Sequence, residues 1–347
     1  MTKPTVFVSG ATGYIAQHIV KQLLDSQKYN VIGSYRNTEK ADQLRANFKN
    51  NSHLSLVKVE DLGHIEAFAK VFQEYGPKLD YILHTASPLD FSAKDLENDM
   101  IMPAINGTKG IIQATVNYAP NVKKFVMTSS VAAVMSPLPA DRDPHKKIVY
   151  TEESWNNRKL EDSLNNAYSA YSYSKTAAEK LAWELHKELH PKFSLTTINP
   201  VLVLGPQCFD SNAAGKLNVS SEIIDDLLHT KPNDEITNTR NGSYIDVRDV
   251  ARAHLECITN DNLDGHRLIL SEAKYTMQTF ADIINKNFPQ LKGKIAKGVP
   301  GSDKKAIEEL PTVLDNHVTK ELLGFEFKKI DEIVKDVIEQ VLKVQQL

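Results

Sequence analysis

The chain has 347 residues, of which 41% are hydrophobic and 24% charged, and its formal net charge is -3. This composition is that of a globular protein and excludes disordered, collagen-like and disulfide-rich chains. The nearly neutral charge offers no basic field for nucleic acid, and no apolar run approaches the ~20 residues of a membrane span. The two cysteines, Cys208 and Cys257, lack any framework or metal-ligand spacing, and the N-terminus lacks a signal-peptide core. We therefore expect a cytoplasmic protein that binds neither nucleic acid, nor membrane, nor metal.

Short apolar, β-branched runs alternate with helix-length segments over the first two hundred residues. The expected strands are Thr5–Ser9, Asn30–Tyr35, Leu54–Val59, Tyr81–His84, Lys124–Thr128 and Ser194–Ile198. Helices are expected at Tyr14–Asp25 and from Thr38 to about Phe48, and further helix-length segments separate the later strands. This alternation predicts a doubly wound, Rossmann-type α/β fold, in which helices cover both faces of a parallel sheet. Ligands of such sheets bind beyond the carboxyl ends of the strands.

The alternation becomes irregular beyond Pro200. Residues 205–240 have the turn-rich composition of loops and short helices. The remaining expected elements are a helix at Tyr244–Ile258, a short strand at Arg267–Leu270, and helices at Met277–Asn287 and Lys329–Val344. We expect a dinucleotide-binding domain made of residues 1–200 and 240–265, and a smaller, interrupted substrate domain made of residues 201–239 and 266–347.

A glycine-rich turn, Gly10-Ala-Thr-Gly13-Tyr-Ile-Ala16, directly follows the first strand. One glycine permits a tight turn and the other a close approach of the backbone to a pyrophosphate. The next helix then offers free N–H groups and its positive dipole end to that anion. The spacing alone is a weak signal, and an ordinary strand-to-helix turn is the alternative. Its position between the first strand and the first helix favours a dinucleotide site.

The end of the second strand has no acidic residue for a ribose 2′-hydroxyl. Arg36 and Lys40 stand there instead, four residues apart, which favours a 2′-phosphate and hence NADP over NAD. A solvated helix start is the alternative. Asp61-Leu62, after the third strand, is expected near the adenine unless Asp61 is only an exposed loop residue. The segment His84-Thr-Ala-Ser-Pro88 is expected to line the phosphates and the nicotinamide ribose, with His84 packed rather than catalytic.

Tyr171 and Lys175 share one face of an expected helix at the i, i+4 spacing. An ammonium beside a phenol stabilises the phenolate and lowers its pKa, which makes the phenol a usable proton donor. The spacing arises about once by chance in a chain of this composition, so the pair is weak support alone. Ser129 and Ser130 end an upstream strand, where a hydroxyl can bond both a substrate carbonyl and the tyrosine, or only local backbone.

Together these residues resemble the extended short-chain dehydrogenase/reductases. The chain is most similar to the dihydroflavonol-reductase-like subfamily, which includes yeast NADPH-dependent methylglyoxal and 3-methylbutanal reductases. The resemblance spans Thr5 to about Phe327 and includes the downstream run Tyr244-Ile-Asp-Val-Arg-Asp-Val-Ala. It implies a catalytic set of Ser130, Tyr171 and Lys175, with Lys175 also holding the nicotinamide ribose. The NADPH/NADP+ contacts implied are Gly10, Ala11, Thr12, Gly13, Tyr14, Ile15, Arg36, Lys40, Asp61, Leu62, Ala86, Tyr171, Lys175, Val203 and Ser220.

Two positions depart from relatives in this family. Ala104 stands where many short-chain reductases have an asparagine that relays protons, so a direct asparagine relay is not expected. Met135 stands where plant dihydroflavonol reductases have an asparagine that binds flavonoid hydroxyls, and an apolar residue there leaves such hydroxyls unpaired. The expected pocket for aliphatic or aryl carbonyls is lined by Leu89, Val131, Met135 and Leu202, of which one or two are expected to be plain core.

The sequence therefore predicts an NADPH-dependent carbonyl reductase that acts on aldehydes and ketones such as methylglyoxal, 3-methylbutanal, diketones and aryl ketones. An NAD-dependent nucleotide-sugar epimerase or dehydratase shares the expected fold and the Tyr-Lys pair, but the missing acid after the second strand counts against it. A non-catalytic NADP-binding redox sensor is the other alternative, and the Tyr-Lys pair counts against it. The physiological substrate is open, and both a monomer and a homodimer are expected possibilities.

Overall fold

A computed structural model describes residues 2–87, 90–143, 145–215, 217–237 and 239–345. Its centre is a seven-stranded parallel sheet with the order β10-β7-β5-β4-β1-β2-β3. The strands are β1 (Thr5–Ser9), β2 (Asn30–Tyr35), β3 (Leu54–Lys58), β4 (Tyr81–His84), β5 (Lys124–Thr128), β7 (Ser194–Pro200) and β10 (Arg267–Leu270). The strand order reverses between β1 and β4, so the carboxyl ends of these two strands flank the crevice in which such sheets bind ligands. The predicted doubly wound, Rossmann-type fold is confirmed.

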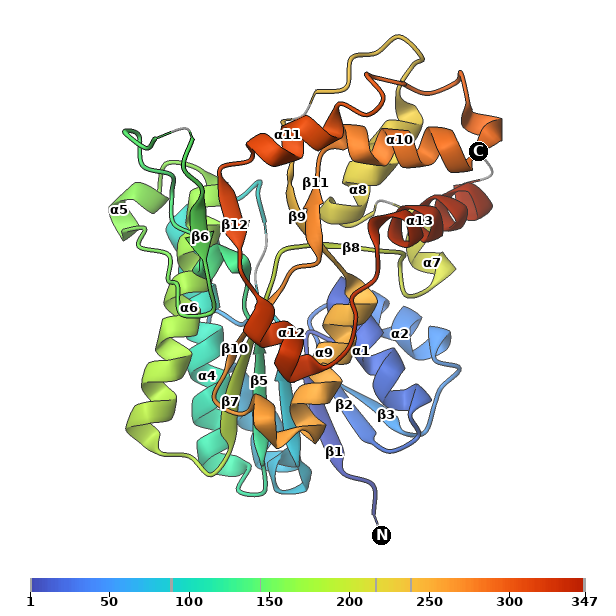
Figure 1. Ribbon diagram of the computed structural model, residues 1–347. Helices are drawn as coiled ribbons and strands as arrows, with labels where there is room; N and C mark the ends of the chain where they lie inside the picture. The colour runs from blue at the N-terminus through green and yellow to red at the C-terminus, as the bar shows by residue number, and fades with distance from the viewer. Residues whose placement is uncertain (1, 88–89, 144, 216, 238, 346–347) are drawn as a thin grey trace.

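Residues alternate between the two faces of the sheet, as the period of a strand requires. Val6 and Val8 pack into the core beneath α1 (Tyr14–Asp25), α2 (Thr38–Asn47) and α9 (Val247–Thr259). Phe7, between them, packs into the opposite core with α3 (Ala69–Tyr75), α4 (Met102–Tyr118) and α6 (Ala167–Leu189). Figure 1 shows these two helical layers on either side of the sheet. Short 3-10 turns η1 (Ile65–Phe68), η2 (Gly76–Lys78) and η4 (Val131–Ala133) and a π-helical turn η3 (Glu97–Ile101) connect the elements.

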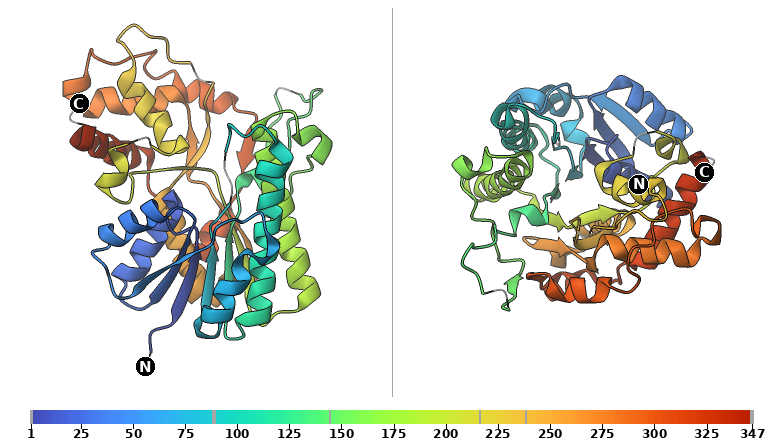
Figure 2. Two further views of the ribbon diagram at one scale, coloured as in Figure 1. Left: turned by 180° about the vertical axis from the view of Figure 1, so that it is seen from behind. Right: turned by 90° about the horizontal axis from the view of Figure 1, so that it is seen from above.

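A smaller unit lies over the carboxyl ends of the strands (Figures 1 and 2). Its three-stranded sheet has the order β11-β9-β8. The strands are β8 (Leu202–Leu204), β9 (Gly242–Asp246) and β11 (Ala273–Tyr275). Its helices are α7 (Asp210–Ala213), α8 (Val219–Asp225), η5 (Asp226–His229), α10 (Met277–Asn287), η7 (Pro289–Leu291), α11 (Asp303–Glu309) and α13 (Ile330–Gln345). All of these elements except α11 contribute to a second hydrophobic core, separate from the two that cover the large sheet.

A third, two-stranded sheet pairs β6 (Ile148–Tyr150) with β12 (Thr312–Leu314) beside the large sheet. The short helices α5 (Leu160–Ser163), η6 (Asp261–Leu263) and α12 (His317–Leu323) complete the described elements. No helix in these described ranges is long and apolar enough to cross a bilayer.

The structure differs from the sequence-based expectations at two elements. The helix expected from Tyr244 starts later, because Tyr244 lies in β9 and α9 begins at Val247. The Asp246 side chain caps α9 by accepting from the Arg248 N–H at 2.6 Å, which fixes the start of the helix. The expected smaller domain began at residue 266, but β10 pairs with β7 in the large sheet. A domain border at residue 266 would therefore separate β10 from the large sheet to which it belongs.

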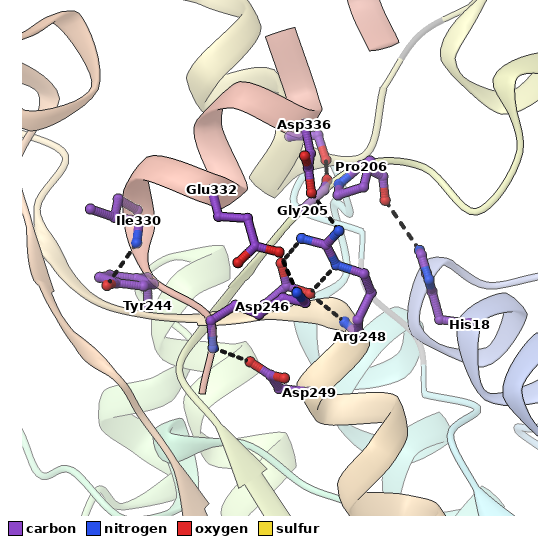
Figure 3. Close-up of polar contacts among 12 residues, drawn as sticks. His18, Gly205, Pro206, Tyr244, Asp246, Arg248, Asp249, Ile330, Glu332 and Asp336 are labelled. Carbon is purple, nitrogen blue, oxygen red and sulfur yellow. Dashed lines mark hydrogen bonds and ion pairs between the residues drawn. The ribbon is translucent and has the colours of Figure 1, made fainter. Parts of the chain in front are cut away.

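A partly buried ionic cluster joins the two units (Figure 3). Asp246 is fully buried and accepts from the Arg248 guanidinium at 2.7 and 2.8 Å. The same guanidinium reaches Asp336 on α13 at 2.5 Å. The Tyr244 hydroxyl accepts from the Ile330 N–H at 3.1 Å, where α13 begins. These contacts fasten the C-terminal helix to the strand and helix that lie beside the large sheet.

Asp249, in the same cluster, carries a buried carboxyl group. It accepts a hydrogen bond from the Lys328 N–H at 2.7 Å, and burial raises its pKa to about 6. Because this folded-state pKa exceeds the unfolded value, ionisation favours the unfolded chain, and the fold loses stability as the pH rises from about 4 to about 6. The Asp249→Asn variant, whose amide oxygen can still accept, is expected to melt at a higher temperature than the wild type at pH 8.

The gain of Asp249→Asn corresponds to about 1–2 kcal/mol and is expected to vanish near pH 4, where the wild-type carboxyl is neutral. Thermal denaturation followed by circular dichroism at both pH values checks this. Asp141→Asn, on an exposed turn, is the matched control and should leave both melting temperatures unchanged. A wild type that is more stable than Asp249→Asn at pH 8 would contradict the expectation.

Candidate active site

The glycine turn between β1 and α1 forms an open cradle for an anion. Gly10 has φ +67°, and a β-carbon there would lie 3.1 Å from the Cα and Cβ of Ala86. Gly13 is the N-cap of α1 in extended conformation, and no side chain caps the helix. The first amides of a 12-residue helix are therefore left for a ligand, as a dinucleotide pyrophosphate requires. The turn thus fits the cofactor that the sequence predicts.

Gly10→Ala is expected to weaken NADPH binding about tenfold and to lower the melting temperature, because alanine is both strained at positive φ and crowded against Ala86. Fluorescence titration with NADPH and thermal denaturation measure the two effects. Gly324→Ala is the control: it has φ +64° with nothing within 4 Å of a β-carbon, so it carries the strain without the contact. Equal NADPH affinity in the two variants would contradict the close-approach argument.

The loop after β4 is fixed beside the glycine turn by Ser9. The Ser9 hydroxyl accepts from the N–H groups of Thr85 and Ala86 at 2.9 and 3.0 Å and lies 2.8 Å from His84 Nδ1. With two amides donating to it, the hydroxyl gives its own proton to Nδ1, which assigns the His84 proton to Nε2. Burial lowers the pKa of His84 to about 3, so the ring stays neutral. His84 thus has the packing role that the sequence suggested.

The residues predicted for the adenine end lie beyond β2 and β3. Arg36 directly follows β2 and Lys40 lies in the first turn of α2; both are exposed, and neither has an ion-pair partner in the part of the chain that the structure describes. Asp61 is exposed and accepts from the Gly63 N–H at 2.7 Å, whereas Leu62 is partly buried. All four follow the carboxyl ends of neighbouring strands, on the same edge as the glycine turn.

Val203 and Ser220 come from the smaller unit. Val203 is buried in the hydrophobic core to which α1 contributes and against which Tyr14 and Ile15 pack. Ser220 accepts from Asn218 Nδ2 at 2.6 Å, and no contact among the described residues connects it to the glycine turn. Its neighbour Ser221 does make that connection, because its hydroxyl donates at 3.4 Å to the Gly205 carbonyl, which also accepts from the Tyr14 hydroxyl.

Gly205 is a residue of this junction that the sequence reasoning did not assign. The Tyr14 hydroxyl donates to the Gly205 carbonyl at 2.8 Å, and burial raises the pKa of Tyr14 far above its usual value. Gly205 has φ +135°, and a β-carbon there would lie 2.9 Å from Val247. The Gly205-Pro-Gln run was the available signal, because a glycine that ends a strand pattern often marks a close approach.

The three predicted catalytic residues meet at the carboxyl end of β5. Ser130 follows this strand and caps η4, with its Oγ accepting from the Ala132 N–H at 3.1 Å. Tyr171 and Lys175 lie one turn apart on α6, which begins after the Asn166 cap. The Ser130 side chain lies beside the Tyr171 hydroxyl and acts to lower its pKa. Lys175 is buried and its Nζ donates to the Thr128 carbonyl at 3.3 Å.

The environments of the two titratable groups differ from the simple Tyr-Lys expectation. Burial raises the pKa of Tyr171, and the hydrogen bond from Ser130 only partly opposes this. Burial lowers the pKa of Lys175 to about 8, and the nearby Glu179 opposes that shift. In the protein alone the pKa of Tyr171 is therefore raised, against the expectation that Lys175 lowers it, because burial outweighs the contacts that favour the phenolate.

The geometry distinguishes the two adjacent serines. The Ser129 hydroxyl donates to Glu179 Oε2 at 2.5 Å, so it points into the protein interior. The Ser130 hydroxyl contacts Tyr171 instead. Of the two serines, Ser130 is the one that interacts with the phenol, and its catalytic role stays a prediction.

The predicted pocket residues separate into two groups. Val131 and Met135 are partly buried in one small cluster directly after Ser130, whereas Leu202 packs against the core of the smaller unit. Leu89 lies outside the described residues. Ala104 is buried on α4. Phe91, which the sequence gave no signal to choose, has its ring centroid 6.0 Å from that of Tyr171 and is 44% exposed.

The fold and the cradle define a dinucleotide-binding protein of the short-chain dehydrogenase type. Residues 6–270 match the NAD dependent epimerase/dehydratase family, and the chain belongs to that family. It is 45% identical over 344 residues to the NADPH-dependent methylglyoxal reductase of Saccharomyces cerevisiae, with coverage of 98% of this chain and 99% of the relative.

Solved structures agree with this assignment. The crystal structure of yeast methylglyoxal/isovaleraldehyde reductase complexed with NADPH has a TM-score of 0.92 at 44% identity and covers 99% of each chain. The NADPH complex of the corresponding Candida albicans protein has the same TM-score and identity and covers 98% of this chain and 99% of that one.

Proposed function

We propose that the protein is an NADPH-dependent carbonyl reductase that converts aldehydes and ketones to alcohols. The observation that carries the proposal is the meeting of Ser130 and Tyr171 at the carboxyl edge of the sheet, with Lys175 one turn away on the same helix. Relatives of nearly equal length are named NADPH-dependent reductases, and two solved neighbours contain NADPH.

The chain's own residues would polarise and protonate the substrate. NADPH, when bound, supplies a hydride to the carbonyl carbon. The Ser130 hydroxyl donates a hydrogen bond to the carbonyl oxygen, which polarises the bond. The Tyr171 hydroxyl gives its proton to the same oxygen as negative charge develops there. Lys175 holds the nicotinamide ribose and stabilises the phenolate that remains on Tyr171.

The raised pKa of Tyr171 suits this role. A buried phenol with a raised pKa is protonated at neutral pH, so the proton is in place before the reaction begins. The Lys175 pKa of about 8 keeps that ammonium mostly charged near neutrality. A reductase that uses these groups loses the ammonium as the pH rises through about 8, and its activity should decline there.

The pocket and the two units define the rest of the proposal. The large sheet would hold the cofactor, and the substrate would bind between it and the smaller unit, which lies over the carboxyl ends of the strands. Val131 and Met135, which follow Ser130, and Phe91, whose ring contacts Tyr171, would supply apolar walls, which suits aliphatic or aryl carbonyls and leaves polyphenol hydroxyls unpaired. The unpaired cysteines, Cys208 and Cys257, support a reducing, cytoplasmic setting. The protein works there as a monomer or homodimer, without nucleic acid.

NADPH oxidation by the purified protein tests the proposed function. The panel contains methylglyoxal, 3-methylbutanal, a diketone, an aryl ketone and a dihydroflavonol. Turnover of the aliphatic or aryl carbonyls, with little for the dihydroflavonol, is expected. Protein purified with tightly bound oxidised NAD would favour a nucleotide-sugar epimerase. NADPH binding without turnover of any carbonyl would favour a redox sensor.

A further inference from the structure

Glu179 is a fully buried carboxylate on α6, one turn beyond Lys175. Four donors from three other elements surround it. Oε2 accepts from Ser129 Oγ at 2.5 Å and from Asn199 Nδ2 at 2.7 Å. Oε1 accepts from Thr197 Oγ1 at 3.0 Å and from Arg267 Nε at 2.6 Å. A buried carboxylate is tolerated only with such complete pairing, so its position is closely fixed.

Arg267, from β10, is the counter-ion and is itself held rigidly. Its side chain is only 9% exposed. Its Nη1 donates to the carbonyl oxygens of Glu152 and Ser154, both at 2.6 Å. Its guanidinium carbon lies 3.7 Å from the centroid of the Trp155 ring. The ion pair with Glu179 therefore connects the edge of the large sheet to the helix that carries Tyr171 and Lys175.

Two of the Glu179 contacts lead directly to the catalytic serine. Ser129 precedes Ser130 in the chain, and its hydroxyl is fixed by the carboxylate. Asn199, on β7, donates from the same Nδ2 to Glu179 and, at 3.2 Å, to the Ser130 carbonyl. The backbone at Ser130 is thus held at two points, through the side chain of the preceding Ser129 and through the Ser130 carbonyl oxygen.

We propose that Glu179, with Arg267 as its counter-ion, is a positioning residue for the catalytic set: it holds Ser130 in line with Tyr171 and places a compensating negative charge behind Lys175. This inference rests on the proposed reductase function. Glu179 touches no substrate in this scheme and acts through Ser129, Asn199 and Lys175.

Among the groups that face Lys175, Glu179 is the one whose negative charge stabilises the ammonium. On α6 itself these groups are Glu179 and Tyr171. β5 presents the Thr128 carbonyl, and β4 presents His84, whose pKa of about 3 keeps it neutral. From α9, His254 bonds the Thr128 hydroxyl at 2.7 Å and is neutral as well, with a pKa lowered to about 4 by burial. Removing the Glu179 charge should therefore lower the pKa of Lys175 further.

Glu179→Gln tests the proposal, because glutamine keeps the shape but loses the charge and half of the acceptors. We expect kcat for an aldehyde to fall about 10- to 100-fold with a smaller change in KM. We also expect the alkaline limb of the kcat–pH profile to move to lower pH. Glu184→Gln, exposed on the same helix, is the matched control and should leave both unchanged.

A second readout does not depend on turnover. The NADPH dissociation constant, measured by fluorescence across pH 6–10, should begin to rise at a lower pH in Glu179→Gln than in the wild type, because Lys175 loses its proton earlier. A wild type that binds NADPH but reduces no carbonyl overturns the proposed function, and the binding profile still tests the Glu179 charge.

Two further variants separate position from charge and serve if Glu179→Gln does not fold. Ser129→Ala removes one hydrogen bond and no charge, so kcat should fall about 3- to 10-fold with no movement of the alkaline limb. Arg267→Lys keeps the counter-charge but loses the bonds to Glu152 and Ser154, and should likewise lower kcat. A Glu179→Gln protein that has a lower melting temperature but wild-type kcat and pH profile would show a purely structural role. Wild-type kcat in both Ser129→Ala and Arg267→Lys would also overturn the proposal.

Discussion

Tyr171→Phe is expected to lower kcat for an aldehyde by about 10²- to 10⁴-fold while the NADPH dissociation constant stays within about threefold. The phenylalanine ring keeps the packing against Phe91 and the place of the helix, so only the hydroxyl is lost. Without the Tyr171 hydroxyl, no group beside Ser130 remains to donate a proton to the carbonyl oxygen. Steady-state NADPH oxidation, together with a fluorescence titration of NADPH, measures the two quantities.

Tyr168→Phe is the matched control for this experiment. Tyr168 lies three residues earlier on α6 and is 66% exposed, so its hydroxyl is expected to have no role in turnover. A Tyr171→Phe protein with wild-type kcat would refute the proposed proton transfer. A Tyr171→Phe protein that no longer binds NADPH would show that the hydroxyl positions the cofactor rather than the proton.

The large sheet was predictable because its central strands are buried on both faces. Continuous apolar runs such as Thr5–Ser9 and Lys124–Thr128 are typical of strands that are covered on both faces. The structure has strands at the same residues. The glycine turn and the Ser130 segment then meet because parallel strands end at one edge. Local sequence therefore determined which segments surround the site, even though the residues that meet there are far apart in the chain.

The expectations that failed depend on tertiary contacts. β9 and α9 follow one another without a break in apolar pattern, and only the Asp246 cap separates them. β6 and β12 are three residues each and pair across more than 150 residues of chain, a contact that no local pattern contains. The pKa of Tyr171 rises because burial outweighs its neighbours, and the i, i+4 spacing carries no information on burial.

The Glu179 network shows the same limit at the site itself. In sequence, Glu179 is one more charged residue on a helix, and such residues are usually solvated. Its role becomes visible only when Asn199 from β7 and Arg267 from β10 are placed around it. Fully buried polar groups of this kind are specified by contacts between distant strands, so a single sequence cannot identify them.

The double variant Arg36→Ala/Lys40→Ala is expected to raise KM for NADPH about 10²- to 10³-fold and to leave KM for NADH within about threefold. The physical reason is the 2′-phosphate, a dianion that only NADPH carries. Each charge-assisted hydrogen bond to it contributes about 1.5–3 kcal/mol, and about 1.4 kcal/mol corresponds to a tenfold change. Both side chains are exposed and without ion-pair partners among the described residues, so they are free to reach the phosphate.

The control for this pair is Arg45→Ala, on the same helix. Arg45 is already engaged with Asp42 at 2.6 Å, and it lies near the far end of α2, so its removal changes the net charge without removing a phosphate contact. If Arg36 and Lys40 acted only by long-range attraction, Arg45→Ala would weaken NADPH binding to a similar degree. High salt would then abolish the difference in KM between the variants and the wild type. A specific 2′-phosphate site instead predicts that the preference for NADPH over NADH collapses in the double variant alone. An unchanged ratio of the two KM values would place the phosphate elsewhere.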